Sequence, residues 1–371
     1  MFRAKALDGL RGCAALVVVA QHVMLTYELF AKSALENVSS GNLFIDAFTL
    51  SPLHIFWAGT EAVFLFFVIS GYAVAKLAQN SKNNLQFYLS RFVRLYLPLL
   101  TAIILGLILW QVVLANTPDT SQVGFTGAWT QYVNPAKLDV FQFLRELSLE
   151  SRGSVIPPVW SLKVEVIFSM LIFVYLRLLK NQSYADTIFY FSVIYFIALL
   201  SGSFLVHYLA VFGFGIALAL REQKLRSDPW QFFRWKIPAL PAEGSVRQGT
   251  WAQILGLCLL LSQAHWWRIP FQLDYYVAQL LMMAGIYGIV LCAFYYQAFN
   301  KQLTSRVSLW LGKISYSLYL VHAPIILVSI YLWPYNWEVA LVAGVISIPV
   351  AWLFWAIFER NFHKLASKMR R

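Results

Sequence analysis

Seven long apolar stretches determine what kind of fold this chain can form. Each of them reaches or approaches the roughly 20 residues that cross the hydrocarbon core of a bilayer as an α-helix. The composition agrees, since 60% of the 371 residues are hydrophobic and only 12% are charged. A multi-span membrane protein is therefore expected. The stretches cover residues 10–29, 56–77, 92–115, 160–180, 280–299, 310–333 and 338–358.

Three shorter apolar stretches extend the predicted bundle, at residues 187–204, 206–220 and 250–264. One helix over residues 187–220 would be about 51 Å long against a hydrocarbon core of about 30 Å, so two spans fit better. The prediction is an all-α, polytopic bundle of about ten transmembrane helices.

The distribution of lysine and arginine supports this number of helices. If the N-terminus is cytoplasmic, 20 of the 29 lysines and arginines flank the inner ends of the predicted helices, and five flank the outer ends. Such an excess is the positive-inside pattern of cytoplasmic loops. Merging residues 187–220 into one helix would move the basic loop 221–249 to the outside. Both termini are therefore predicted to be cytoplasmic.

Charge and cysteine content narrow the function further. The formal net charge is +12, but it is spread along the inner loops and no soluble binding module accompanies it, so nucleic acid is not an expected partner. Cys13, Cys258 and Cys292 lie in apolar helices without metal-ligand spacing, which predicts neither a disulfide framework nor a zinc site. The first apolar run lacks the cleavage pattern of a signal peptide.

We expect one membrane domain over residues 1–371, without internal repeats and with two long connections. The outer connection, residues 116–159, is long and mixed enough to form a small cap over one mouth of the bundle. The inner one, residues 221–249, has the composition of an irregular cytoplasmic segment. Both are also explained as plain linkers.

Arg11 and His22 lie eleven positions apart in the first predicted span. Eleven steps of about 100° turn both side chains in nearly the same direction, about 16 Å apart along the axis. Ionisable groups within spans usually face a cavity, a partner or a transport path. Anchoring at the cytoplasmic end also explains Arg11, and a hydrogen bond between helices also explains His22. A buried, neutral His22 would be able to accept a proton.

Two further segments carry polar groups toward the inner side. Arg91 and Arg94 lie one helical turn apart before the third span, a spacing that suits phosphate binding, although topology alone also places basic residues there. In the second span, Glu61 lies near the outer end, whereas Ser70 and Gly71 lie toward the inner end. A glycine there lets a ligand or another helix approach closely.

The fourth and ninth spans also contain polar residues. Glu165 follows Trp160 and Ser161 at the outer mouth and lies on the same helical face as Ser161. An acid within a span needs a partner, and His22 or Lys163 could supply one. Hydrogen bonds between helices would also explain the hydroxyl groups of the ninth span. Its polar residues are Lys313, Ser315, Tyr316, Ser317, Tyr319 and His322.

Together these segments resemble the acyltransferase-3 family of polytopic membrane proteins. The shared motifs follow that family's order over nearly the whole chain, and the ordered set is far more specific than any single motif. They are an arginine and a histidine separated by ten residues in the first span, EAVFLFFVISGY in the second, RFVR before the third, WSLKVE opening the fourth, ISYSLYLVH in the ninth and FERNF after the tenth.

The resemblance implies transfer of an acetyl or other short acyl group from cytoplasmic acyl-coenzyme A to a hydroxyl of an envelope or exported carbohydrate. The donor's phosphates would lie near Arg11, Arg91 and Arg94, and its thin pantetheine arm would present the thioester near His22. His22 would then act as general base on the acceptor, with Glu165 orienting or balancing the imidazole.

The candidate site residues fall into three groups under this hypothesis. The catalytic candidates are His22, Glu165 and Arg11. The candidates for binding the acyl-coenzyme A are Arg11, Arg91, Arg94, Ser70, Gly71, Lys313, Ser315 and Tyr316. The candidates for binding the acceptor are Glu61, Trp160, Ser161 and His322. A hydroxyl of Ser315, Ser317 or Tyr316 would support the developing oxyanion.

The expected partners are a carbohydrate acceptor and membrane lipids, the expected location is the bacterial cytoplasmic (inner) membrane, and no metal is expected.

Phe64 departs from the family, because many relatives have an acidic residue there. Some relatives append an esterase-like domain; none is expected here, so we expect the membrane domain or a separate protein to complete the transfer. An acyl-His22 relay and direct transfer both remain possible on sequence grounds. A transporter of a lipid-linked glycan or a proton-coupled solute is the alternative function.

Overall fold

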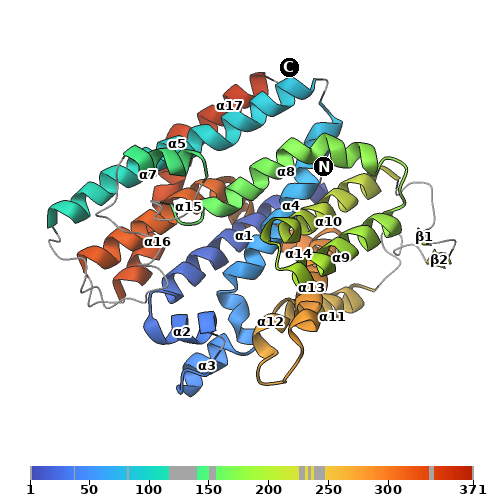
Figure 1. Ribbon diagram of the computed structural model, residues 1–371, viewed down its shortest axis with the longest axis horizontal. Helices are drawn as coiled ribbons and strands as arrows, with labels where there is room; N and C mark the ends of the chain where they lie inside the picture. The colour runs from blue at the N-terminus through green and yellow to red at the C-terminus, as the bar shows by residue number, and fades with distance from the viewer. Residues whose placement is uncertain are drawn as a thin grey trace.

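The computed structural model describes residues 2–36, 38–81, 83–116, 140–149, 156–224, 230–232, 235–237, 247–333 and 338–369. These residues form a bundle of long helices with one small hairpin (Figure 1). In the described part of the chain, nine helical segments are long and apolar enough to cross a membrane. They are α1 (Phe2–Met24), α4 (Gly59–Gln79), α5 (Asn84–Asn116), α8 (Val159–Leu178), α9 (Tyr184–Ser201), α10 (Phe204–Lys224), α13 (Tyr275–Tyr295), α15 (Arg306–Leu332) and α16 (Glu338–Phe354) with its continuation to Lys368.

The remaining predicted span is α11 (Gln248–Ser262), which has 15 residues and is therefore only about 22 Å long. All ten apolar stretches are thus helical, and the all-α prediction is confirmed. The predicted break within residues 187–220 is also confirmed, because Gly202, with φ +63, caps the end of α9 before α10 begins. Glycine adopts this left-handed conformation without the steric penalty of a side chain.

Several short elements connect the spans. Most of the two long connections lies outside the described residues, so the suggested cap stays a prediction. The helix α7 belongs to the outer connection, and the two strands, paired antiparallel with Trp230 opposite Ile237, belong to the inner one. The short elements are α2 (Glu28–Glu36), α3 (Leu43–Thr49), η1 (Pro52–Phe56), α7 (Val140–Leu147), β1 (Trp230–Phe232), β2 (Trp235–Ile237), α12 (Ala264–Trp267), α14 (Gln297–Leu303), the π-helical turn η4 (Trp355–Glu359) and α17 (Arg360–Lys368).

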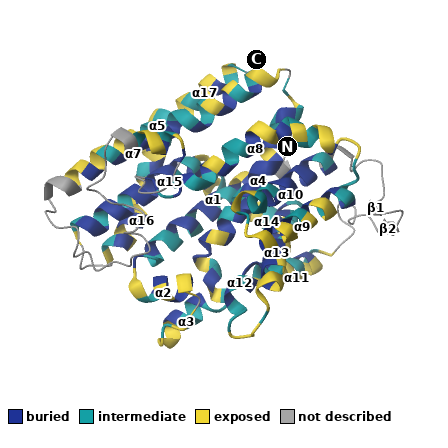
Figure 2. Cartoon of the chain, viewed as in Figure 1, coloured by how far each residue is buried: buried dark blue, intermediate teal, exposed yellow. Residues whose placement is uncertain are grey.

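The helix α1 lies at the centre of the bundle and separates two hydrophobic cores. One core joins α1 to α4, α8, α10 and α13, and the other joins it to α5, α15 and α16. Gly12 allows the close contact with α15, because a Cβ atom there would lie 2.5 Å from the backbone nitrogen of Gly312. Overpacking at such a contact typically costs about 1–3 kcal/mol. In Figure 2, α4 and α15 contain many buried residues. Within an 18-residue apolar segment of each helix, 72% of the segment in α4 and 78% of the segment in α15 is buried.

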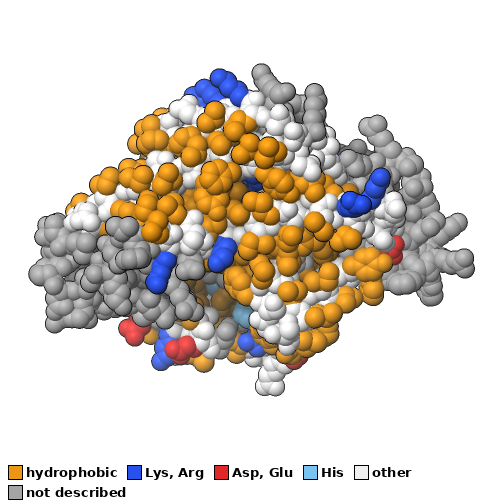
Figure 3. All heavy atoms as spheres, turned by 45° about the horizontal axis from the view of Figure 1, so that its top comes forward, with side chains coloured by type: hydrophobic (Ala, Val, Ile, Leu, Met, Phe, Trp, Pro, Cys, Tyr) orange, Lys and Arg blue, Asp and Glu red, His pale blue; other side chains and the backbone are white. Residues whose placement is uncertain are grey.

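The outer helices present hydrophobic side chains on the surface. Ile108 of α5, Ile197 of α9, Leu257 of α11 and Val345 of α16 are each more than half exposed. Figure 3 shows such side chains covering much of one face of the molecule. An apolar surface of this extent would be unfavourable in water, and it suits the hydrocarbon core of a bilayer. The fold is that of a multi-pass membrane protein.

Candidate functional site

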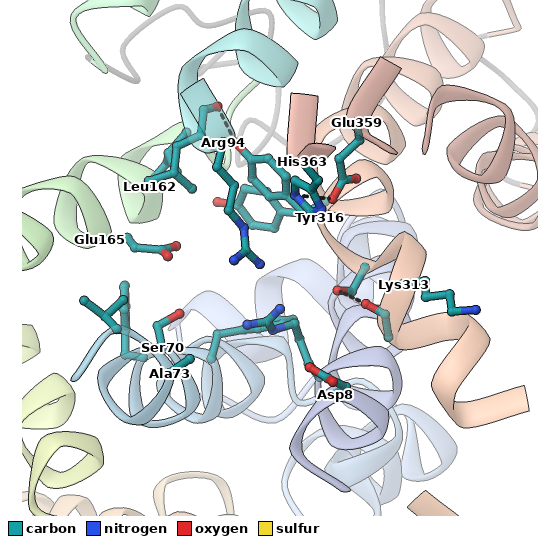
Figure 4. Close-up of a pocket in the computed structure, with 18 of the residues that line it drawn as sticks. Asp8, Ser70, Ala73, Arg94, Leu162, Glu165, Lys313, Tyr316, Glu359 and His363 are labelled. Carbon is teal, nitrogen blue, oxygen red and sulfur yellow. Dashed lines mark hydrogen bonds and ion pairs between the residues drawn. The ribbon is translucent and has the colours of Figure 1, made fainter. Parts of the chain in front are cut away.

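A cavity of about 560 Å³ opens between α1, α4, α5, α8, α15 and the segment from η4 to α17 (Figure 4). The cavity brings together residues that are widely separated in the sequence. Nine of the predicted site residues line it, namely Arg11, Ser70, Arg91, Arg94, Ser161, Glu165, Lys313, Ser315 and Tyr316.

Arg91 is held by an ion pair on one wall of this cavity. Its Nη2 atom lies 2.7 Å from Oε1 of Glu165 and donates to Oγ of Ser169 at 2.9 Å. The sequence suggested that His22 or Lys163 would pair with Glu165, but the structure places Arg91 in that position. It also places Arg91 as the eighth residue of α5, whereas the third span was predicted to begin at residue 92. Arginine is a good helix former, so its charge does not end a helix.

Arg94 is arranged differently from Arg91. Figure 4 shows its guanidinium extending into the cavity. The carboxylate of Glu165 also points into the cavity. The two arginines therefore do not form a symmetrical clamp, because the guanidinium of Arg91 is already bound by the protein. Lys313 lines the cavity, but its exposed side chain points away from the centre in Figure 4.

Glu359 is a cavity residue that was not among the candidates from the sequence. It is buried at the end of η4, where it accepts a hydrogen bond from Ser317 and lies 3.3 Å from Nε2 of His363. It also interacts electrostatically with Arg94 and Arg11. The available signal was an acid within the motif FERNF, directly after an apolar span. A π-helical turn such as η4 is frequent at functional sites.

The formal charge of the cavity lining favours an anionic ligand. Among the residues that the structure describes, five lysine and arginine side chains line it against three carboxylates. The basic residues are Lys5, Arg11, Arg91, Arg94 and Lys313, and the acidic ones are Asp8, Glu165 and Glu359. Guanidinium groups suit phosphate oxygens in charge and in geometry.

Two hydroxyl groups are linked on the side of the cavity formed by α8 and α15. The hydroxyl of Tyr319 donates to the carbonyl oxygen of Pro158, so Ser161 supplies the proton of the 2.6 Å bond between Ser161 and Tyr319. Tyr319, another residue not selected from the sequence, is 6.2 Å from the ring of His322, measured between centroids.

The hydroxyl groups predicted to support an oxyanion have protein acceptors. Ser315 donates to the carbonyl oxygen of Gly312 at 2.9 Å, and Tyr316 donates to that of Leu95 at 2.7 Å. The hydroxyl of Ser317 donates to Glu359. Support of an oxyanion by these groups would require their hydrogen bonds to rearrange.

His22 is in contact with His322, and neither residue lines the cavity. The Nδ1 atom of His22 lies 2.7 Å from Nε2 of His322. His322 is fully buried, whereas His22 is partly exposed. A continuous series of contacts therefore leads from Ser161 at the cavity through Tyr319 and His322 to His22.

Three other predicted contacts lie away from the cavity lining. A Cβ atom on Gly71 would lie 2.1 Å from the carbonyl oxygen of Phe212, so this glycine serves the contact between α4 and α10. Trp160 packs against the aromatic rings of Phe204 and Tyr208. Glu61 is buried and accepts a hydrogen bond from Nε1 of Trp266 at 2.5 Å.

The surroundings of Glu61 include a buried histidine, His54, in the short helix η1. Its ring stacks on that of Trp266 with centroids 3.8 Å apart. Burial, assisted by the nearby His265, lowers the pKa of His54 to about 3. Burial, assisted by Arg268, lowers the pKa of His265 to about 4. Both imidazoles are therefore neutral in the folded protein near pH 7.

This cluster predicts that the folded protein loses stability in mild acid. An unfolded histidine binds a proton below a pH of about 6.5, whereas His54 in the folded protein resists protonation down to about pH 3. The unfolded state therefore binds more protons as the pH falls from about 6.5, and it is favoured. Thermal unfolding midpoints measured in detergent between pH 7 and 4.5 should fall less steeply for His54→Phe than for the unchanged protein. If the unfolding midpoints of the two proteins fell equally with pH, His54 would not be a cause of the acid sensitivity.

The comparison with protein families finds a match over nearly the whole chain. A family model described as an acyltransferase domain, acyltransferase-3, matches residues 4–356. No curated protein and no solved structure matches the chain. The matched segment contains His22, His322 and every residue of the cavity lining except Glu359 and His363.

Proposed function

The chain belongs to the acyltransferase-3 family of membrane acyltransferases, and we propose that it transfers an acetyl or other short acyl group from acyl-coenzyme A to a carbohydrate hydroxyl. In this proposal His22 is the general base. The main observation in support of the proposal is the cationic cavity at one end of α1. A series of contacts leads from this cavity to His22 near the other end of the helix.

The cavity residues fit the donor by charge and by position. Arg11 and Arg94 would bind phosphate groups, and Arg91, held by Glu165, would add to the positive potential. Arg11 and His22 lie about 16 Å apart along α1, a distance that suits a long, thin pantetheine arm between phosphates and thioester. Ser161 and Tyr319 would lie beside this arm.

The proposed reaction is a direct acyl transfer. His22 removes the proton of the acceptor hydroxyl, and the oxygen forms a bond to the carbonyl carbon of the thioester. The carbon–sulfur bond then breaks, and the leaving thiolate takes the proton from the imidazolium of His22. The products are the acyl ester of the acceptor, free coenzyme A and neutral His22.

The proposed sidedness follows from the basic residues. Both termini and the cationic cavity would face the cytoplasm of a bacterial cell, where acyl-coenzyme A is made, in agreement with the positive-inside pattern. The acceptor would then approach from the extracytoplasmic side. A carbohydrate suits that side, since its hydroxyls can form hydrogen bonds and its ring can stack on aromatic side chains.

The release of free thiol from acetyl-coenzyme A tests the proposed function. Purified protein should release thiol in the presence of an oligosaccharide acceptor, and the His22→Gln variant should do so at least about a hundredfold more slowly. A transporter would bind or move its solute without cleaving the thioester. Failure of the unchanged protein to cleave a series of short acyl-coenzyme A donors, with several acceptors, would contradict the proposal.

Replacement of Arg94 should weaken donor binding specifically. A hydrogen bond to a charged group contributes about 1.5–3 kcal/mol, so Arg94→Ala should raise the KM for acetyl-coenzyme A by roughly 10- to 100-fold. Arg177→Ala is the matched control, because Arg177 is exposed near the end of α8 and does not line the cavity. The KM for the acceptor should stay the same in both variants. A change confined to the KM for the acceptor would show that Arg94 does not bind the donor.

A further inference from the structure

The imidazole rings of His22 and His322 meet edge to edge. Their planes are inclined by only 9° and their centroids are 4.9 Å apart, while the nearest nitrogen atoms are separated by 2.7 Å. The centroid separation equals the distance between the nitrogens plus about one ring radius on each side. The contact is therefore a hydrogen bond in the plane of both rings and not a face-to-face stack.

The surroundings of His322 determine which nitrogen donates in this bond. Nδ1 of His322 lies 2.7 Å from the carbonyl oxygen of Leu318. A carbonyl oxygen only accepts hydrogen bonds, so the proton of His322 is on Nδ1. A second proton would place a charge on a fully buried side chain, which is costly. Nε2 of His322 is therefore an acceptor, and the hydrogen between the rings belongs to Nδ1 of His22.

We infer that His322 is a positioning residue, which fixes His22 in the tautomer with its proton on Nδ1. The lone pair that accepts the proton of the substrate hydroxyl is then on Nε2 of His22. This inference rests on the proposed function of His22 as general base, and it gives His322 a different role from the acceptor contact suggested by the sequence. The peptide carbonyl of Leu318, through His322, fixes the orientation of the base.

The same bond would stabilise the charge that forms during transfer. When Nε2 of His22 takes a proton, its Nδ1–H becomes a charged donor, and its hydrogen bond to the neutral His322 becomes stronger. A carboxylate has this role in many acyl-transfer sites. Glu165, which the sequence suggested as the partner of His22, is instead bound to Arg91. Phe64, at the position where many relatives have an acidic residue, packs against His207 and Tyr208.

Two amide variants separate this role from simple packing. In His322→Gln, the end of the side chain can reach the position of Nε2 and accept the proton of His22. In His322→Asn, the shorter side chain can still donate to Leu318 but cannot reach His22. We expect the Gln variant to retain kcat within about tenfold, and the Asn variant to lose on the order of a hundredfold or more, at an unchanged KM for acetyl-coenzyme A.

The tautomer itself is measured by nitrogen NMR of protein labelled with ¹⁵N-histidine. The chain has six histidines, and the difference between the spectra of the unchanged protein and His22→Gln identifies the signals of His22. His22 should carry its proton on Nδ1 in the unchanged protein and in His322→Gln. In His322→Asn, it should shift toward the tautomer protonated on Nε2.

The outcomes distinguish the two proposals. A proton on Nε2 of His22 in the unchanged protein overturns the inference, even if neither amide variant folds. An unchanged tautomer together with full activity in His322→Asn overturns it as well. Full activity of His22→Gln instead contradicts the general base of the proposed function, whatever the tautomer of His22 is.

Discussion

The His22→Gln variant should lose acyl transfer by a factor of about 10²–10⁴, the usual contribution of a general base. Glutamine preserves much of the size of the imidazole and can still form hydrogen bonds, but it cannot accept a proton near pH 7. The loss should appear in kcat and not in the KM for acetyl-coenzyme A, because the donor phosphates are proposed to bind at Arg11 and Arg94.

His207→Gln is the control for this prediction. His207 is another partly buried histidine within a span, where it packs against Tyr195 and Phe64, and it does not line the cavity. This variant should remain active if it elutes from a sizing column like the unchanged protein. Equal activity of the two glutamine variants would remove His22 from the chemistry.

The second large effect is expected from breaking the ion pair between Arg91 and Glu165. In Glu165→Leu, the guanidinium of Arg91 keeps its hydrogen bond to Ser169 but loses the carboxylate that balances its charge. Leaving a buried charge without its partner costs about 3–5 kcal/mol, and the 24% exposure of the Glu165 side chain places the expected loss at the low end, about 3 kcal/mol. Denaturation in detergent micelles would measure this loss.

The double variant Arg91→Met, Glu165→Leu provides the internal control. It removes both charges and replaces them with apolar side chains of similar length, so it should recover most of the stability lost in Glu165→Leu. If Glu165→Leu were as stable as the unchanged protein, the ion pair would contribute little to stability. A double variant no more stable than the single one would point to lost packing instead.

The sequence was sufficient to predict the spans, because hydropathy over about 20 residues depends only on local composition. It also predicted the break between α9 and α10, where a single helix would be too long and where Gly202 ends α9. It did not predict the short helices α2, α3 and η1, which are too short to produce a clear apolar period. The start of α5 was missed for a different reason, since its first two turns include polar residues that hydropathy does not assign to a span.

The candidate site was predicted as a set of residues but not as a set of partners. Polar positions within spans identified nine of the residues that line the cavity, because such residues seldom face lipid. Which of them meet depends on the rotation and tilt of each helix, and a single sequence does not encode these directly. For this reason Glu165 was matched with His22 or Lys163 instead of Arg91, and the contact between His22 and His322 was not foreseen.

Transfer across the membrane is the central claim, and reconstituted vesicles test it most directly. The orientation of the protein would first be established with single cysteines at the exposed positions Leu43 and Asn80, after Cys13, Cys258 and Cys292 are replaced by serine. With labelled acetyl-coenzyme A on the Asn80 side and a membrane-impermeant oligosaccharide on the Leu43 side, we predict acetylated oligosaccharide on the Leu43 side. Acetylated oligosaccharide formed only when both substrates are on the Asn80 side would contradict the account.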